Sequence, residues 1–476
     1  MEEINVLSQS TAIILTLTIS IIFIFIGIIY SKKYQGINNY LVANRSVGTF
    51  SLTMSLVASA LGAWILFGPA SAATWGGIGA VIGYAAGTAF PLFILIYLGE
   101  KFRKFYPNGK TLIEVIRIRF GLRLFKLILF LSIFYMTIFL IAEVTAVSIL
   151  IKYISGTDLW ISALIVITSS LVYTLYGGLR ASLFTDNIQF IVFIFLILIA
   201  FGFIFSQNAS EFNFDFIREN KPNLVSSKYL PNLTAGLTFF IAVAATNLFH
   251  QGNWQRVYAA KNYIVLRNSL IISFFIIIPV VFFIGFCGLV AVSKNSNVLP
   301  DLAFFHLLLK ENTILFSVII ILLAISLTVS SIDTLINAIS SLIIVDGNKV
   351  IKIKGNYLNF SKYIILLISL FAFFVASKGL SILYLFLLAD LFCCAAVFSV
   401  FYSFYSKTFD EKSAYTSILI GLLAGILFFP SPDFSKSILI GIILPAQFFP
   451  DFISKSLLFC SFIVATFVPI FTWRIR

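Results

Sequence analysis

Long apolar stretches separated by short polar segments run along the whole chain. An uncharged apolar stretch of about 17 or more residues is long enough to cross a bilayer as a helix. Counted in this way, the sequence predicts thirteen spans, at residues 11–31, 49–75, 78–98, 123–153, 158–176, 186–206, 233–251, 263–293, 313–346, 358–377, 379–405, 414–429 and 453–473. The apolar stretches 301–310 and 436–446 are too short to span, so we expect re-entrant or interfacial helices there. The predicted fold is an all-α, multi-pass membrane protein.

The second and seventh predicted spans are interrupted. The second contains Gly62 and Gly68-Pro69, and the seventh contains His250 and Gly252. Each begins a block of five spans, and the odd number of spans in a block makes the second block an inverted copy of the first. Interruptions at matching places of two repeats indicate a midplane site in a secondary transporter, where open helix ends bind a cation or an anionic group. Close helix packing is the competing explanation for Gly62 and Gly252.

These blocks divide the chain and predict its orientation. We expect an extra N-terminal span with a cytoplasmic loop (1–45), the first repeat (46–206), an external loop (207–232), the inverted repeat (233–405) and C-terminal spans (406–476). Basic loops lie on the side of Lys32-Lys33, which is predicted to be the cytoplasm. The N-terminus is then outside a plasma membrane and the C-terminus is cytoplasmic. The first span has an acidic start and no cleavage site, so we expect it to be retained.

Composition excludes several classes of protein. Hydrophobic residues make up 60% of the chain and charged residues 11%, whereas a soluble domain carries roughly 25% charged residues. The net charge of +13 lies mainly between spans, so it predicts orientation rather than nucleic-acid binding. The four cysteines lie in apolar stretches without metal-site spacing, and there is no G-x-x-x-x-G-K-[ST] nucleotide loop. No cofactor is expected.

The ninth predicted span carries a polar stripe that lipid would not tolerate. The stripe includes Ser330, Ser331, Asp333 and Thr334. Hydroxyls and carboxylates in hydrocarbon are costly unless a neighbouring helix, a cavity or an ion satisfies them. We therefore expect this stripe to face the bundle interior and to hold an ion. Hydrogen bonds from the serine hydroxyls to carbonyls one turn earlier are the alternative.

With these features the chain resembles the sodium:solute symporter family, which includes bacterial proline permease and sodium–galactose transporters. The resemblance rests on Ser330-Ser331 with Asn337 and Asp346, on Ala58 to Trp64, on Tyr176-Gly177-Gly178-Leu179 with Phe184 to Gln189, and on Gln255-Arg256 with Ala259-Ala260-Lys261. It implies a leucine-transporter-type core, and sodium-coupled import of a small polar solute by alternating access. Sodium would be the co-transported ligand, and the oligomeric state stays open.

The resemblance also implies where ions would bind. The sodium site would consist of backbone carbonyls and hydroxyls of Ala58, Leu61, Leu327, Ser330 and Ser331. Such hard oxygen ligands suit a hard cation. A candidate second ion site contains Asp186, Asp333 and Thr334. Asp186 could instead cap its own helix, and Asp333 could serve sodium, a proton or the structure alone.

The substrate residues are expected on the interrupted helices and their neighbours. They are Trp64, Phe67, Glu143, Asn247, Phe249, His250 and Asp390. Glu143 and Asp390 lie inside apolar spans, so each would bind a cationic group, remain protonated or pair with a polar neighbour. A protonated His250 could receive a carboxylate, which favours an amino acid or small carboxylate, although simple packing is the alternative. Ala60 stands where the family's proline carriers have Asp, which argues against proline.

Several other functions are alternatives to sodium symport. A proton-coupled carrier is the nearest because of Asp333, and a sodium-coupled sugar or urea carrier is a variant. A channel would offer a continuous pore rather than two broken helices. The acidic residues show no nucleophile–base pair or metal spacing, so we expect no enzyme. A sensor without transport would need a signalling domain, and no such domain is visible in the sequence.

Overall fold

The computed structural model describes residues 6–34, 36–309, 314–351, 357–406, 409–437, 439–440 and 450–473. Within these ranges the chain is helical, and the only β pairing is two isolated bridges. The helices are α1 (Gln9–Lys32), α2 (Ile37–Val42), α3 (Thr49–Ala60), α4 (Gly68–Phe105), α5 (Leu112–Arg119), α6 (Leu122–Ser155), α7 (Leu159–Asn208), α8 (Phe214–Asn220), α9 (Pro222–Val225), α10 (Leu230–Phe249), α11 (Gln251–Ala259), α12 (Tyr263–Lys294), α13 (Ala303–Leu308), α14 (Ile314–Val345), α15 (Tyr357–Ala376), α16 (Ile382–Tyr402), α17 (Glu411–Phe428), α19 (Asp451–Lys455) and α20 (Leu457–Thr472). Short 3-10 turns are η1 (Ala43–Arg45), η2 (Ala63–Leu66), η3 (Pro300–Leu302) and η4 (Gly347–Lys349).

Ten helices of the described ranges are long and apolar enough to cross a membrane. They are α1, α4, α6, α7, α10, α12, α14, α15, α16 and α17, and α3 and α20 are shorter apolar helices. The described residues therefore do not form thirteen separate long helices. Part of the difference arises in α4 and α7, which continue through bends at Gly77 and Gly178, where φ is 61° and 58°. Glycine adopts this left-handed conformation without a steric penalty.

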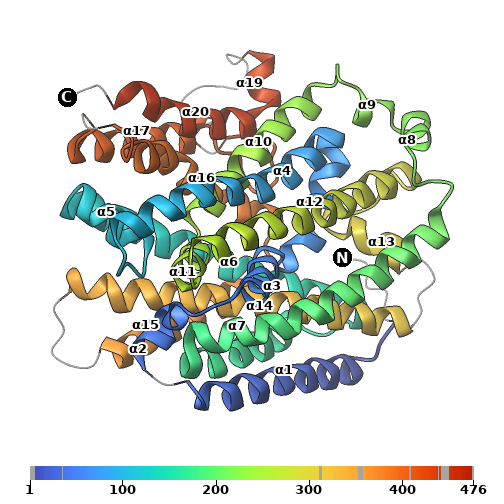
Figure 1. The fold of residues 1–476 in the computed structure, drawn as a ribbon. Coiled ribbons are helices and arrows are strands. Elements are labelled where there is room, and N and C mark those ends of the chain that lie inside the picture. Colours follow the sequence, from blue (N-terminus) through green and yellow to red (C-terminus); the bar gives the residue numbers. More distant parts are fainter. Residues whose placement is uncertain are drawn as a thin grey trace.

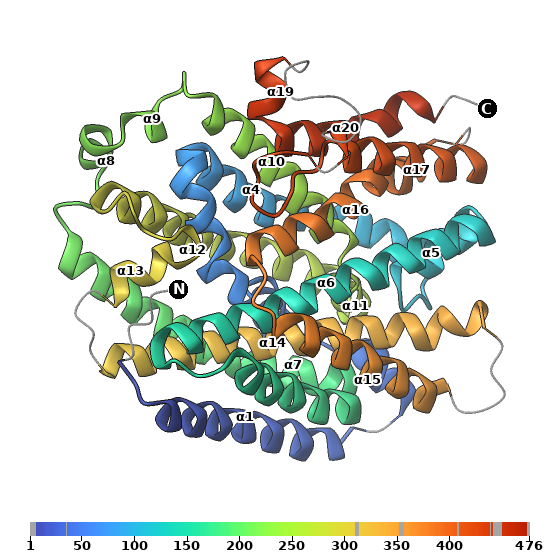
Figure 2. The same cartoon turned by 180° about the vertical axis from the view of Figure 1, so that it is seen from behind.

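The helices lie roughly side by side in layers. In both ribbon views α1 and α7 form one side of the bundle, α17 and α20 the other, and α4, α6, α10 and α14 lie between them (Figures 1 and 2). α4 packs along α10 and α12, and α7 packs along α1 and α14. Gly79, Gly83 and Gly87 of α4 approach the α10 backbone so closely that a Cβ would collide with it.

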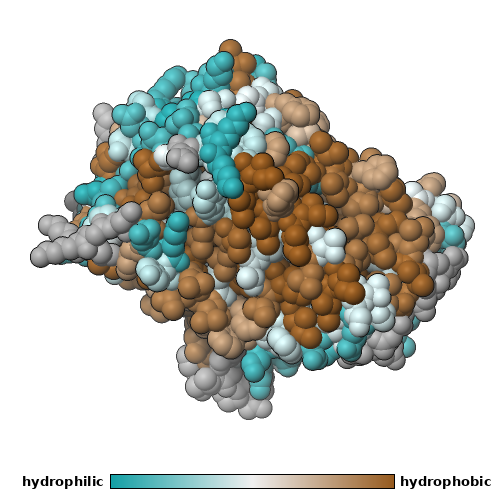
Figure 3. Space-filling model, turned by 90° about the horizontal axis from the view of Figure 1, so that it is seen from below, coloured by the Kyte–Doolittle hydropathy of each residue, from teal (hydrophilic) through white to brown (hydrophobic). Residues whose placement is uncertain are grey.

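The outer surface matches a lipid environment. Figure 3 views the α1 side and shows a broad hydrophobic band, with hydrophilic residues gathered beyond its margins. Ile14, Ile21 and Phe25 of α1 are among the exposed apolar side chains. An apolar surface of this extent is unfavourable in water, so the helices are those of a multi-pass membrane protein.

Both predicted interruptions are present. α3 ends at Ala60, Leu61 and Gly62 are not helical, and α4 resumes at Gly68 after η2. In the second case α10 ends at Phe249, and His250 is non-helical before α11 begins at Gln251. Gly252 lies inside α11, where a Cβ would collide with Thr334 and His250. Its small size is therefore needed for close packing rather than for the break.

The segments predicted as connections contain short helices. The loop 207–232, which the sequence predicts to be external, contains α8 and α9. Most of 301–310 is η3 and the buried helix α13, whereas most of 436–446 lies outside the described residues.

Candidate functional site

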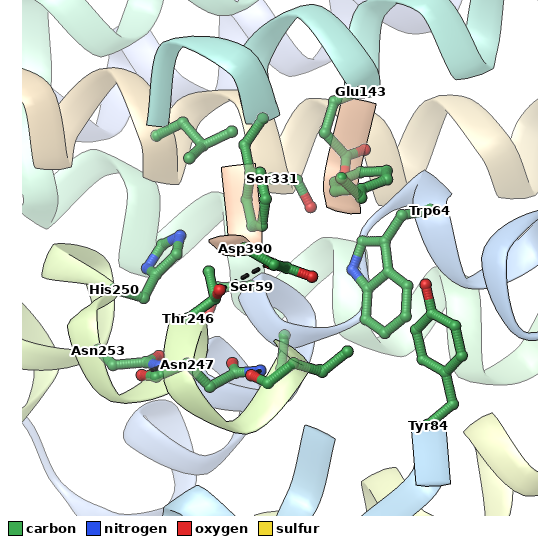
Figure 4. A pocket seen from close by; sticks show the side chains of 15 residues that line it. Ser59, Trp64, Tyr84, Glu143, Thr246, Asn247, His250, Asn253, Ser331 and Asp390 are labelled. Atoms are coloured by element: carbon green, nitrogen blue, oxygen red, sulfur yellow. Dashed lines mark hydrogen bonds between the residues drawn. The ribbon is translucent and has the colours of Figure 1, made fainter. Parts of the chain in front are cut away.

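A cavity lies where the two interrupted helices meet α4, α6, α14 and α16. The space inside it that no atom fills, open solvent included, is about 640 Å³. Figure 4 shows its lining side chains converging from these helices. The lining residues are Ser59, Ala60, Trp64, Tyr84, Phe139, Glu143, Val243, Thr246, Asn247, His250, Asn253, Ser331, Leu335, Phe386 and Asp390.

Glu143 links the cavity to the break after α3. Its side chain is buried, and its Oε2 accepts a hydrogen bond of 2.9 Å from the backbone N–H of Ala63. A Cβ at Gly62 would collide with both Glu143 and Ser331. The carboxylate, the non-helical backbone and the Ser331 hydroxyl are therefore close neighbours.

Asp390 and His250 line the cavity from α16 and from the break between α10 and α11. The Thr246 hydroxyl donates to Asp390 Oδ1 at 2.6 Å (Figure 4). The Gly252 N–H donates to His250 Nδ1 at 3.1 Å. Because this nitrogen accepts, the ring is neutral and carries its proton on Nε2. The structure therefore gives no support to a carboxylate bound by a protonated His250.

Five of the seven predicted substrate residues meet at this cavity, namely Trp64, Glu143, Asn247, His250 and Asp390. Phe67 and Phe249 lie elsewhere. The Phe67 ring packs on Phe305 with centroids 5.0 Å apart, and the Phe249 ring packs on Phe401 at 5.3 Å. Both side chains are buried in the protein interior.

Several residues that line the cavity were not predicted from the sequence. Thr246 and Asn253 lie about one helical turn before and after the break at His250, and this spacing could have identified them. Tyr84, Phe139 and Phe386 come from helices whose sequences are apolar on most faces, so no local pattern distinguishes a cavity-facing ring.

A buried charged network lies beside the cavity. Arg256 of α11 and Asp186 of α7 are fully buried, and Arg256 Nη2 lies 2.8 Å from Asp186 Oδ2. The same guanidinium donates to Ser55 Oγ at 2.8 Å, Thr334 Oγ1 at 3.0 Å and the Gly252 carbonyl at 3.1 Å. Asp186 lies within α7 and bonds to other helices, so the alternative that it caps its own helix is wrong.

Asp333 is the second carboxylate of this network. It is fully buried and accepts hydrogen bonds from Tyr173 at 2.7 Å, Ser182 at 2.9 Å and Thr185 at 3.2 Å. Thr334 contacts both Arg256 and Asp333. The three residues of the candidate second ion site are thus brought together, and the network holds two carboxylates but one guanidinium.

The residues of the predicted sodium site lie at the end of α3 and in the middle of α14. Ser330 Oγ donates to Asp186 Oδ1 at 2.6 Å. The buried Ser331 Oγ lines the cavity and has no hydrogen-bond partner among the described residues. Ala58 lies in the last turn of α3, where helix carbonyls lack intrahelical partners, and Leu61 is non-helical. Leu327 is buried one turn before the serines.

Comparisons with known proteins agree with this architecture. The profile of the sodium:solute symporter family matches residues 40–421. A spermidine transporter, DUR31, of Candida albicans (strain SC5314 / ATCC MYA-2876) is 27% identical over 411 residues, which are 83% of this chain and 76% of that protein. A sodium/proline symporter of Haemophilus influenzae (strain ATCC 51907 / DSM 11121 / KW20 / Rd) is 26% identical over 233 residues, 47% of this chain and 45% of the relative.

A solved structure shares the fold. A substrate-bound, outward-open Na+-coupled sialic acid symporter superposes with a TM-score of 0.72 at 17% identity, and the match covers 97% of this chain and 98% of the other. At this identity the likeness concerns the fold alone.

Proposed function

Because the chain belongs to the sodium:solute symporter family, we propose that it imports a small organic solute together with sodium by alternating access. The observation that carries this proposal is the cavity itself. It lies at two helix breaks and includes the Ser331 hydroxyl, which has no hydrogen-bond partner in the described part of the chain. The members of this family are transporters rather than enzymes, and sodium and a small solute are their ligands. Moving one charge inward across 100 mV provides about 2.3 kcal/mol, enough for a roughly fiftyfold solute gradient.

We assign sodium to the end of α3 and to α14. The ligands would be the carbonyls of Ala58, Leu61 and Leu327 with the hydroxyls of Ser330 and Ser331. Two facts support this assignment: α3 ends beside α14, and Ser331 has a buried hydroxyl that no described residue satisfies. Oxygen ligands without a carboxylate suit a monovalent hard cation.

A second cation would bind at Asp186, Asp333 and Thr334. The described residues give this buried network two carboxylates and one guanidinium, and an uncompensated buried charge is expensive. Sodium or a proton would supply the missing charge. This is the observation that keeps proton coupling as the second candidate function.

The finer points of the fold and topology are also proposals. Thirteen spans and a five-plus-five inverted repeat require that α4 and α7 each count as more than one span, and their bends at Gly77 and Gly178 support this. The N-terminus would lie outside and the C-terminus in the cytoplasm. The relatives are named for different solutes, spermidine and proline among them, so solute identity has to be argued from the cavity.

A sodium titration of thermal stability tests the proposal. A ligand that binds only the folded protein raises the melting temperature, so sodium should raise it in a saturable way and potassium should not. Ser331→Ala should need about tenfold or more sodium for the same shift, since one of few ligands is lost. The matched control is Ser399→Ala, whose buried hydroxyl pairs with Ser417 away from the cavity. Equal sodium dependence in wild type and Ser331→Ala would overturn the site.

A further inference from the structure

The cavity contains two carboxylates that have no cationic partner among the described residues. Glu143 enters it from α6 and Asp390 from α16 (Figure 4). Neither makes an ion pair with any described residue, and no Lys or Arg is among the described residues that line the cavity. Their bonds come from neutral donors, the Ala63 N–H and the Thr246 hydroxyl. His250 is neutral because its Nδ1 accepts from Gly252.

This arrangement differs from the charged network nearby. There Asp186 pairs with the buried Arg256. No described residue supplies a positive charge to Glu143 or Asp390, so a ligand in the cavity would have to supply it. A buried carboxylate is stable as an anion only when it is paired and hydrogen-bonded. An anionic solute would add a third negative group, and a neutral solute would require both carboxyl groups either to be protonated or to stay without a counter-charge.

The remaining walls of the cavity suit an alkyl ammonium. The rings of Trp64 and Tyr84 stack with centroids 5.7 Å apart, and Phe386 meets Trp64 at 6.3 Å and Phe139 at 4.9 Å. Aromatic faces attract organic cations and pack against methylene groups. Figure 4 shows Trp64 and Tyr84 on one side of the cavity and His250 with Asn247 on the other.

We propose that the solute is an aliphatic amine with two ammonium groups, one bound by Glu143 and the other by Asp390. A single ammonium brings one positive charge, whereas the cavity presents two carboxylates. The inference rests on the proposed function, because it identifies the solute of that same site. It also gives Glu143 a double role, since the residue would hold one ammonium while its Oε2 bonds to the break beside the sodium ligands.

A series of four-carbon compounds tests the charge requirement at constant length. The melting temperature of the purified protein is measured with 1,4-diaminobutane, 1-aminobutane, 1,4-butanediol and succinate, each in sodium and in potassium. The diamine should stabilise the protein most, the monoamine less, and the diol and succinate not at all. Equal stabilisation by monoamine and diamine, or stabilisation by succinate, would overturn the proposal.

Two isosteric variants locate the interaction. Glu143→Gln and Asp390→Asn keep an acceptor for Ala63 and Thr246, so each should fold while binding the diamine about tenfold or more weakly, as expected when a charged hydrogen bond becomes neutral. Asp301→Asn is the matched control, because Asp301 bonds to Ser71 and does not line the cavity. A cooperative thermal unfolding transition without added ligand reports that each variant is folded. Wild-type diamine affinity in both folded variants would refute the assignment.

The two proposals fail in different ways. Stabilisation by sodium without any response to the diamine would refute the solute while sodium binding stands. Stabilisation by the diamine that is the same in sodium and potassium, without a sodium shift, would refute sodium coupling while the solute stands.

Discussion

Replacing Arg256 by Met should destabilise the protein strongly. The guanidinium is fully buried, lies 2.8 Å from Asp186 and also donates to two hydroxyls and one carbonyl. Met fills much of the volume but leaves Asp186 and Asp333 without a protein cation. Removing one partner of a buried pair costs about 3–5 kcal/mol, so the folded-to-unfolded ratio should fall by roughly two to four orders of magnitude.

A double-mutant cycle separates the ion pair from general packing. Unfolding free energies are measured by denaturant titration in detergent for the wild type, Arg256→Met, Asp186→Asn and the double variant. Because the two side chains contact each other, the double variant should be more stable than the sum of the single losses predicts, by about 0.5–3 kcal/mol. Additive losses, or an Arg256→Met loss below about 1 kcal/mol, would show that the pair does not hold these helices together.

Three further changes have defined outcomes. Gly62→Ala should lower stability by about 1–3 kcal/mol through overpacking against Glu143 and Ser331 and should weaken the sodium-induced melting shift; an unchanged sodium titration would contradict this. Asp333→Asn places an amide N–H₂ next to the hydroxyl donors that now bond to the carboxylate. Denaturant titration should therefore show a free energy of unfolding that is lower by about 1–2 kcal/mol, and wild-type stability would argue against a structural role. Burial raises the pKa of Asp301, so the protonated carboxyl stabilises the folded protein below the usual carboxyl pKa, and this stabilisation is lost as pH rises through the raised pKa. Asp301→Asn should therefore make the melting temperature less dependent on pH. An unchanged pH profile would contradict this assignment.

Much of the helical architecture follows from the sequence alone. Long apolar stretches predict most helices because lipid forces each span to satisfy its own backbone. The first break was predicted from Gly62, a glycine in an apolar stretch. The second break lies at His250, two residues before the predicted Gly252. The continuity of α4 and α7 was not predictable, since a glycine can end a helix or bend it, and tertiary packing decides between them.

The candidate site was predictable where polarity is unexpected. Glu143, Asp390 and the α14 stripe stand out because lipid excludes such groups, and the structure places them at the cavity and the buried network. Phe67 and Phe249 were predicted to contact the substrate but do not line the cavity. An aromatic ring next to a helix break packs equally well into the protein interior or toward a cavity, so the sequence does not distinguish the two. The ion pair of Arg256 with Asp186 was also not anticipated, since it joins helices seventy residues apart in the sequence.

Equilibrium binding of radioactive sodium to the purified protein tests the central claim most directly. We predict saturable binding that excess potassium does not displace, that Ser331→Ala weakens about tenfold or more, and that Ser399→Ala leaves unchanged. Binding that is absent, or that is the same in the wild type and Ser331→Ala, would contradict sodium coupling through this site.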